Sequence, residues 1–143
     1  MDRSIVYVDK AEDASGVRMY SRIGKAVIPY CSAVGKAILA DLGPAGRDAV
    51  LDGVTWQRFT EHTITTRDAL DRELAVVAAR GWAVDDREFE PYVNCVAVPI
   101  RTSLGVVGAI SVTAIRVVAD LDRLKTYLPA LRETADLIAR ELG

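Results

Sequence analysis

The chain has 143 residues, half of them hydrophobic and about a quarter charged, which suits one globular domain with its own core. Its formal net charge of -2 and the lack of a Lys/Arg run argue against a surface that binds nucleic acid or an anionic membrane. Two cysteines and one histidine are too few for a disulfide framework or a zinc site, and no apolar run reaches the roughly 18–20 residues that span a bilayer. We expect a single cytoplasmic domain over 1–143, with no cofactor, metal or membrane contact.

The first half of the sequence predicts a β-hairpin followed by three helices. Apolar and polar residues alternate in two short runs separated by a turn signal, which is typical of paired strands. Ser32 and the pair at 65–66 can cap helices, because their side-chain oxygens accept hydrogen bonds from the first free N–H groups. Gly43 and Gly81 are typical of helix ends. The expected elements are strands over 5–9 and 17–23, a helix from Ser32 to Gly43, a short helix over 46–51 and a helix from 65–66 to Gly81.

The second half predicts three strands and one long helix. The strands are expected over 82–85, 93–100 and 106–113, with a turn at 102–105 that joins the last two. Strands joined by hairpins, with helices between them, indicate an α+β fold with an antiparallel sheet. The final helix is expected over 119–141, and its apolar residues recur every three or four positions. This spacing fits a helix packed across the sheet or a self-association surface, and one helix can serve both. The apolar residues are Leu121, Leu124, Leu128, Leu131, Ala135, Ile138 and Leu142.

One face of the last hairpin carries unusually small side chains. Because side chains alternate along a strand, the branched residues Val96, Val98, Ile110 and Val112 should share the face that packs against helices. Short side chains on the opposite face do not reach a covering layer, so a cavity with a few polar groups, the usual form of a ligand site, is expected there. The alternative is a face open to solvent. The small-residue face holds Cys95, Ala97, Pro99, Ala109, Ser111 and Thr113, together with Val107.

The helix that begins after Ser32 is a second candidate for ligand contact. The backbone N–H groups of Ala33, Val34 and Gly35 have no partner within the helix, and the helix dipole favours an anion beside them. Small side chains would let a carboxylate approach. An ordinary helix start without a ligand is the alternative.

Five segments in order resemble the effector-binding domain of bacterial transcription regulators of the IclR type. They match the family patterns "SAxGKAxLA", "TITD", "RGYAxDDEEF", "CxAxPV" and its closing strand, with Thr66 in place of the Asp of the second pattern. The segments are CSAVGKAILA at 31–40, TIT at 63–65, RGWAVDDREF at 80–89, CVAVPI at 95–100 and GAISVT at 108–113. The resemblance covers nearly the whole chain.

The resemblance implies a GAF-like fold: a curved antiparallel sheet flanked by helices, with a long C-terminal helix and a buried effector pocket. It implies a small-molecule effector, in most members an organic acid such as a keto or sugar acid. It also implies a homodimer or tetramer, and DNA binding only through an N-terminal winged helix-turn-helix that is absent from this chain. Ligand binding is then expected to modulate DNA binding by rearranging the oligomer.

Residue by residue, the resemblance assigns an effector site. The effector carboxylate would bind the backbone of Ala33 and Val34, and four further positions would line the pocket: Asp85, Cys95, Ser111 and Thr113, where Thr113 replaces a Ser of the family. Looser matches add three residues to the pocket wall: Met19, Ile23 and Tyr30. Residues 86–88 are expected on a surface loop.

Three other functions fit parts of the pattern. An enzyme could use Cys95 with His62, or Ser111 with Asp85, but a thiol in the middle of an apolar strand is usually inert. A stand-alone GAF-type module of a signalling protein would have the same fold with a different partner. A purely structural dimerisation domain would bind no metabolite.

Overall fold

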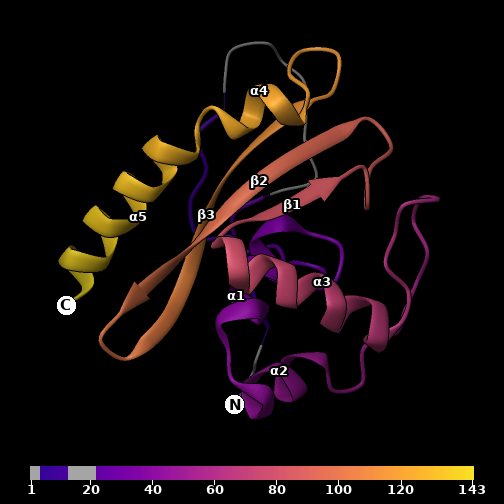
Figure 1. Ribbon diagram of the computed structural model, residues 1–143, viewed down its shortest axis with the longest axis horizontal. Helices are drawn as coiled ribbons and strands as arrows, with labels where there is room; N and C mark the ends of the chain where they lie inside the picture. Colours follow the sequence, from indigo (N-terminus) through magenta and orange to yellow (C-terminus); the bar gives the residue numbers. More distant parts are fainter. Residues whose placement is uncertain (1–3, 13–21) are drawn as a thin grey trace.

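The computed structural model describes residues 4–12 and 22–143, which form a three-stranded antiparallel sheet with helices on both faces (Figure 1). The strand order is β1-β2-β3, so strands adjacent in the sequence are also adjacent in the sheet. The expected α+β fold, an antiparallel sheet flanked by helices, is confirmed. The elements are α1 (Ala33–Asp41), α2 (Pro44–Leu51), α3 (Arg67–Arg80), β1 (Ala83–Asp86), β2 (Val93–Thr102), β3 (Gly105–Ile115), α4 (Leu121–Lys125) and α5 (Leu128–Leu142).

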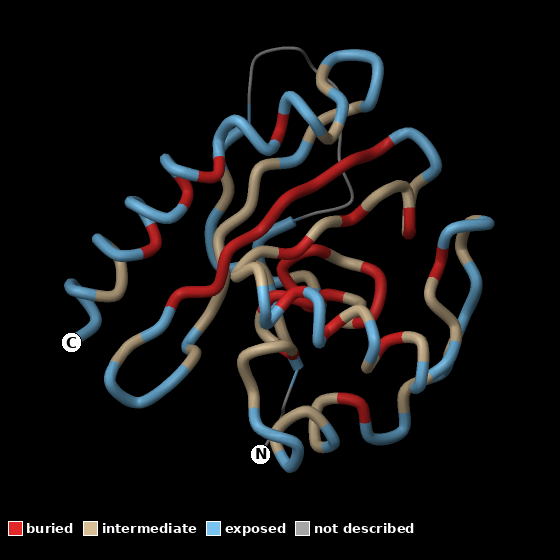
Figure 2. Tube along the Cα trace, in the orientation of Figure 1, coloured by how far each residue is buried: buried red, intermediate tan, exposed pale blue. Residues whose placement is uncertain are grey.

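The register of the sheet separates its two faces as the alternation predicts. Cys95 pairs with Thr113 and Ala97 with Ser111, whereas the intervening Val96 pairs with Val112. Val96 and Val98 of β2 pack in one cluster with α4 and α5, and the small residues Cys95 and Ala97 pack in another with α1 and α3. Buried positions therefore run without interruption along most of β2, which lies between both helical layers (Figure 2).

The caps of α1 and α3 are the expected ones. The Ser32 side chain accepts from the N–H of Gly35, and the Thr66 side chain accepts from the N–H of Ala69. Gly81 ends α3 with a φ of 85°, a left-handed conformation that suits glycine. These local signals fix where each helix begins and ends.

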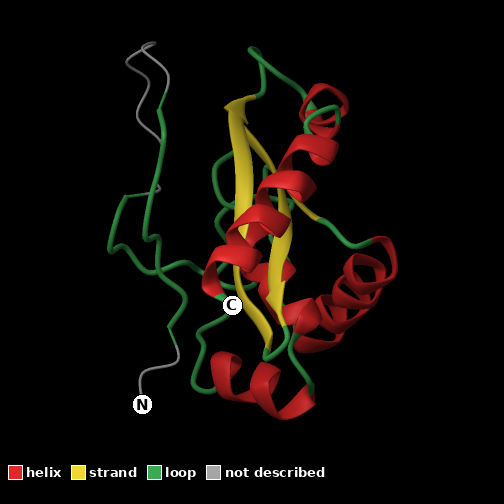
Figure 3. Cartoon of the chain, turned by 90° about the vertical axis from the view of Figure 1, so that its left-hand side faces the viewer, coloured by secondary structure: helices red, strands yellow, loops and turns green. Residues whose placement is uncertain are grey.

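The prediction of a single long C-terminal helix over 119–141 is wrong, because the structure has two helices there. Helix α4 ends near Thr126, whose hydroxyl donates to the carbonyl of Arg123, and α5 begins at Leu128. Pro129 lies in the first turn of α5, where its missing N–H has no partner to lose, so it favours a new helix start. Figure 3, seen from the α5 side, shows this helix lying along the sheet. Leu124, Leu128 and Leu131 are buried against β2, so the sheet-packing interpretation is confirmed.

The prediction of a strand over 5–9, in an N-terminal hairpin, is also wrong. Residues 5–7 run antiparallel to 24–27, with Val27 N–H bonded to the carbonyl of Ile5 at 2.7 Å and Tyr7 N–H to that of Lys25 at 3.1 Å. The contact amounts to one isolated bridge, Val6 with Ala26, in place of the strand expected over 5–9. Most of the second expected strand, over 17–23, lies outside the described residues. The bridge holds Ile5 and Tyr7 against the core cluster of α1 and β2.

Candidate functional site

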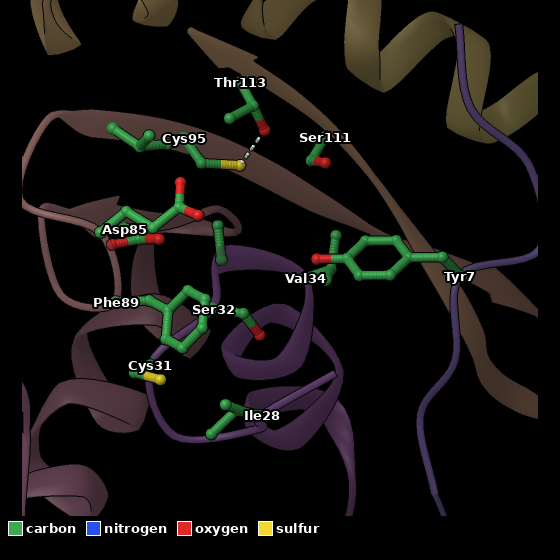
Figure 4. A pocket seen from close by; sticks show the side chains of 13 residues that line it. Tyr7, Ile28, Cys31, Ser32, Val34, Asp85, Phe89, Cys95, Ser111 and Thr113 are labelled. Atoms are coloured by element: carbon green, nitrogen blue, oxygen red, sulfur yellow. Dashed lines mark hydrogen bonds between the residues drawn. The ribbon is translucent and has the colours of Figure 1, made fainter. Parts of the chain in front are cut away.

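A pocket lies between the small-residue face of the sheet and the beginning of α1 (Figure 4). Inside the pocket, the space that the centres of water molecules can occupy is about 60 Å³. The volume of the whole hollow, with the open space at its mouth, is about 550 Å³. One water needs roughly 10–15 Å³ by the first measure, so the interior fits several waters or a small organic molecule. The lining residues are Tyr7, Ile28, Cys31, Ser32, Ala33, Val34, Asp85, Phe89, Glu90, Val93, Cys95, Ser111 and Thr113.

Most of the residues assigned to a site from the sequence meet in this pocket. The backbone of α1 contributes one wall, β1 supplies a carboxyl group, and β2 and β3 supply a thiol and two hydroxyls (Figure 4). The assigned residues that line it are Ala33, Val34, Asp85, Cys95, Ser111 and Thr113. The cavity expected at the small-residue face and the ligand contact expected at the start of the helix therefore concern the same hollow.

The looser assignments do not lie in this pocket. Tyr30 is 1% exposed and packs in the core beside Trp56, while its hydroxyl donates to the Gln57 carbonyl at 2.9 Å and accepts from the Gln57 N–H at 2.8 Å. Tyr30 thus anchors the loop after α2 and is not part of the wall. Ile23 is 66% exposed and absent from the lining, and Met19 lies outside the described residues.

The pocket is lined by the first residues of α1, whose backbone N–H groups have no partner within the helix. The Ser32 side chain accepts from the N–H of Gly35 at 3.1 Å. The N–H groups of Ala33 and Val34 have no partner in the helix, because they belong to its first turn. Gly35 makes this geometry possible, because a Cβ there would lie 2.6 Å from both the Pro29 carbonyl and the Ser32 hydroxyl. Only glycine lets the turn before α1 fold back so closely.

The strand side of the pocket carries a thiol held by a hydroxyl. Thr113 Oγ1 donates to Cys95 Sγ at 3.0 Å, and the two residues are register partners. Burial raises the pKa of the Cys95 thiol to about 12, although the hydroxyls of Thr113 and Ser111 act in the opposite direction. Cys95 is therefore a neutral thiol at physiological pH, unsuited to nucleophilic attack.

Asp85 supplies the pocket with a buried carboxyl group. The residue is 7% exposed, and its Oδ1 accepts from the N–H of Glu88 at 2.7 Å. Burial, aided by the nearby charge of Glu88, raises the pKa of Asp85 to about 7. Near neutral pH this carboxyl can therefore either donate or accept a hydrogen bond.

Comparison with known proteins decides the family. The model of the bacterial transcriptional regulator IclR C-terminal family matches residues 1–140. The chain belongs to the IclR family. It is 36% identical over 141 residues to the HTH-type transcriptional regulator KdgR of Escherichia coli, covering 98% of this chain and 54% of that protein.

Solved structures of IclR-family proteins have the same fold. The crystal structure of the Thermotoga maritima IclR matches with a TM-score of 0.87 and 36% identity, over 96% of this chain and 56% of that one. An IclR homolog from Microbacterium hydrocarbonoxydans, complexed with 4-hydroxybenzoate, matches with a TM-score of 0.84 and 25% identity, over 99% of this chain and 57% of that one.

The chain spans about half the length of the curated relatives it matches. These IclR relatives are transcriptional regulators and not enzymes. Among the described residues, no helix is both long and apolar enough to cross a membrane.

A buried charge pair of the IclR domain, Lys36 with Glu88, was not predicted from the sequence. Glu88, expected on a surface loop, is 5% exposed, and both of its carboxyl oxygens accept from Lys36 Nζ, at 2.8 and 2.9 Å. The Asp86 N–H donates to the same carboxylate at 3.1 Å. A signal did exist, because a lysine within the apolar run of 33–39 needs a buried partner. The pair fastens α1 to the loop that carries Asp85.

Sequence reasoning also missed several pocket-lining residues. Six of them come from the N-terminal segment, the turn before α1 and the loop between β1 and β2, where no periodicity indicates which side chains point inward. Val93, the first residue of β2, could have been found, because alternation along the strand places it on the face of Cys95. The missed residues are Tyr7, Ile28, Cys31, Ser32, Phe89, Glu90 and Val93.

Proposed function

We propose that this chain is the ligand-sensing domain of a cytoplasmic DNA-binding regulator and that its pocket binds a small organic acid. One observation carries the proposal: the same pocket is lined by Ala33 and Val34, the first residues of α1, and by the hydroxyl-bearing residues Ser111 and Thr113 of β3. A carboxylate between them would accept hydrogen bonds from the N–H groups of α1 on one side and from Ser111 on the other, and the Thr113 hydroxyl would have to turn away from Cys95 Sγ to join them. Hydrogen bonds to a charged group are worth roughly 1.5–3 kcal/mol each.

The size and polarity of the pocket support a small ligand with more than one oxygen. The interior volume of about 60 Å³ suits an acid of a few heavy atoms, or a larger one that extends into the mouth. When ionised, Asp85 would accept a hydrogen bond from a ligand hydroxyl and would repel a second carboxylate. This favours hydroxy or sugar acids over diacids. The 4-hydroxybenzoate bound by the Microbacterium relative is also a monocarboxylate with a hydroxyl group.

The ligand would act on DNA binding through the assembly of the regulator. A ligand shifts an equilibrium only if its affinity differs between two states, and such coupling is typically ~1–3 kcal/mol. The two states would be two arrangements of a homodimer or tetramer. DNA contact would be made by a helix-turn-helix segment outside this chain, as the descriptions of the relatives as HTH-type regulators suggest.

A thermal-shift screen tests the proposal. The panel contains glycolate, lactate, glyoxylate and 4-hydroxybenzoate, with lactamide as an uncharged control. We expect at least one acid to raise the melting temperature, because a ligand at a hundredfold excess over its Kd stabilises the folded state by roughly 2.7 kcal/mol. Ser111→Ala should reduce that shift, whereas Ser103→Ala, an exposed serine in the β2–β3 turn, should preserve it. A lack of response to every acid, or an equal response in Ser111→Ala, would refute the assignment.

A further inference from the structure

Acidic side chains contribute to the lining of the pocket, although its proposed ligand is an anion. Asp85 and Glu90 are in the lining, and none of the described lining residues is Lys, Arg or His. Lys36, behind the wall, is fully buried and donates to both oxygens of Glu88, so its charge is largely compensated there. Glu90 is partly compensated by Lys25, whose charge lowers the pKa of Glu90 against the effect of burial. Asp85 is therefore the group whose charge an entering carboxylate meets.

The contacts of Asp85 leave one carboxyl oxygen for a ligand. Its Oδ1 accepts from the Glu88 N–H at 2.7 Å, and among the described residues no ion pair holds this carboxyl. In Figure 4 the carboxyl points into the space below Cys95. The titratable groups that act on it are Lys36 of α1, with Glu88 and Glu90 of the loop after β1, and it in turn raises the pKa of the thiols of Cys31 and Cys95.

We propose that Asp85 meets the bound carboxylate as a neutral acid, so that the pocket takes up a proton from solvent together with its anion. This inference rests on the proposed function and adds a specificity device to it. Two like charges in one buried site disfavour each other's ionised form, whereas a protonated carboxyl donates an O–H hydrogen bond to the anion. The proton resides on the Asp85 oxygen that the Glu88 N–H does not hold. A single proton neutralises a single charge, so a monocarboxylate is accepted and a dicarboxylate is not.

The empty pocket is already close to this state. Burial raises the pKa of Asp85 to about 7, so the group is mostly ionised at pH 8 and mostly protonated at pH 6. A bound anion raises the pKa further, and binding at pH 8 then takes up nearly one proton. By linkage, affinity should fall up to about tenfold for each pH unit above 7 and change little below 6.

Isothermal titration calorimetry measures the proton directly. The acids are lactate and 4-hydroxybenzoate, each titrated at pH 8 in Tris and in HEPES, whose different ionisation enthalpies reveal how many protons the complex takes up. We expect ~0.8–1 proton per bound acid at pH 8 and under ~0.2 at pH 6. Malate, which is lactate with a second carboxylate, should bind at least tenfold more weakly than lactate. Binding at pH 8 with uptake below ~0.2 would overturn this inference and leave the proposed function intact. A failure of both acids to bind would overturn both.

Two variants identify the group that takes up the proton. Asp85→Asn keeps a hydrogen-bond donor without an ionisable proton, so it should bind the acids at pH 8 more tightly than the wild type, with no uptake and a flat pH profile. Asp86→Asn, on the next position of β1 with a 45% exposed carboxyl, serves as the matched control and should keep the uptake. If Glu90→Gln abolishes the uptake and Asp85→Asn retains it, Asp85 is the wrong group. If Asp85→Asn fails to fold, the proton uptake of the wild type at pH 8 and pH 6 still tests the inference.

Discussion

Lys36 and Glu88 form an ion pair almost completely closed to water, with Nζ 2.8 Å from Oε1 and side-chain exposures of 0% and 7%. The pair joins α1, whose first turn forms one wall of the pocket, to the loop after β1. Removal of one partner leaves the other charge buried, whereas replacement of both can be nearly neutral. A single substitution in this pair is therefore expected to lower the stability of the domain strongly, even if the net contribution of the intact pair to stability is small.

Lys36→Met should destabilise the domain by about 3–5 kcal/mol, because the Glu88 carboxylate is left without its buried partner. The double variant Lys36→Met/Glu88→Gln should recover a large part of that loss. Urea denaturation of the wild type, both single variants and the double variant gives the coupling between the two positions. Additive losses would contradict the assigned pairing.

Gly35→Ala should destabilise the domain and impair acid binding together. Its Cβ would lie 2.6 Å from the Pro29 carbonyl, so the turn before α1 would have to move and carry the free N–H groups with it. Gly46→Ala is the matched control, because a Cβ there meets only the flexible side chain of Leu42 at 3.3 Å and a helical Ala can stabilise by about 0.4–1 kcal/mol. Melting temperatures of both variants, with and without lactate, make the comparison. A tolerated Gly35→Ala would show that the close approach is not required.

Asp85→Asn should stabilise the empty domain at pH 8 and have little effect near pH 4. The pKa of Asp85 rises from 3.8 to about 7 on folding, so its favourable contribution is complete below about 3.8 and is lost as the pH rises to about 7. Above that range the wild type carries a buried ionised carboxyl that the amide replaces, a difference on the order of 2–4 kcal/mol. Denaturation at a series of pH values between 4 and 8 checks the sign. A variant less stable than the wild type at pH 8 would show that the ionised form is well compensated.

Leu131→Ala should cost about 2–5 kcal/mol, because Leu131 is 6% exposed in the cluster between α5 and the sheet. Leu142→Ala, at the 65% exposed end of the same helix, should change stability by less than about 0.5 kcal/mol. Equal effects of the two substitutions on unfolding would contradict the packing of α5 described above. Analytical ultracentrifugation of Leu142→Ala would also test the self-association surface considered for this helix.

The sequence predicted those parts of the domain that follow a simple period or a local cap. Alternation along 93–100 and 106–113 placed Cys95, Ser111 and Thr113 on one face, because one buried face forces a strict two-residue repeat. The hydroxyls at Ser32 and Thr66 located two helix starts, since capping depends on only a few neighbouring residues. Both patterns depend on residues close together in the sequence. The strand alternation and the Ser32 cap each mark residues that line the pocket.

Features that depend on distant partners were not predictable in this way. Tyr30 lies one residue before the pocket residue Cys31, yet its hydroxyl bonds to Gln57, a contact that no local pattern announces. Glu88 follows three charged residues and resembles a solvated loop until Lys36 is placed opposite it. The break between α4 and α5 escaped notice because the three- and four-residue spacing continues across Thr126 and Tyr127 even though the backbone does not.

The walls of the hollow come from residues as far apart as Tyr7 and Thr113. No contiguous peptide of the chain contains the site, so partial unfolding of the N-terminal segment, α1 or the sheet would release an occupant. An occupied pocket would oppose all of these openings at once, by roughly 2.7 kcal/mol at a hundredfold excess of metabolite over its Kd. Under the proposed function, the abundance of that metabolite would also set how fast the domain is degraded, because proteases act on the opened population.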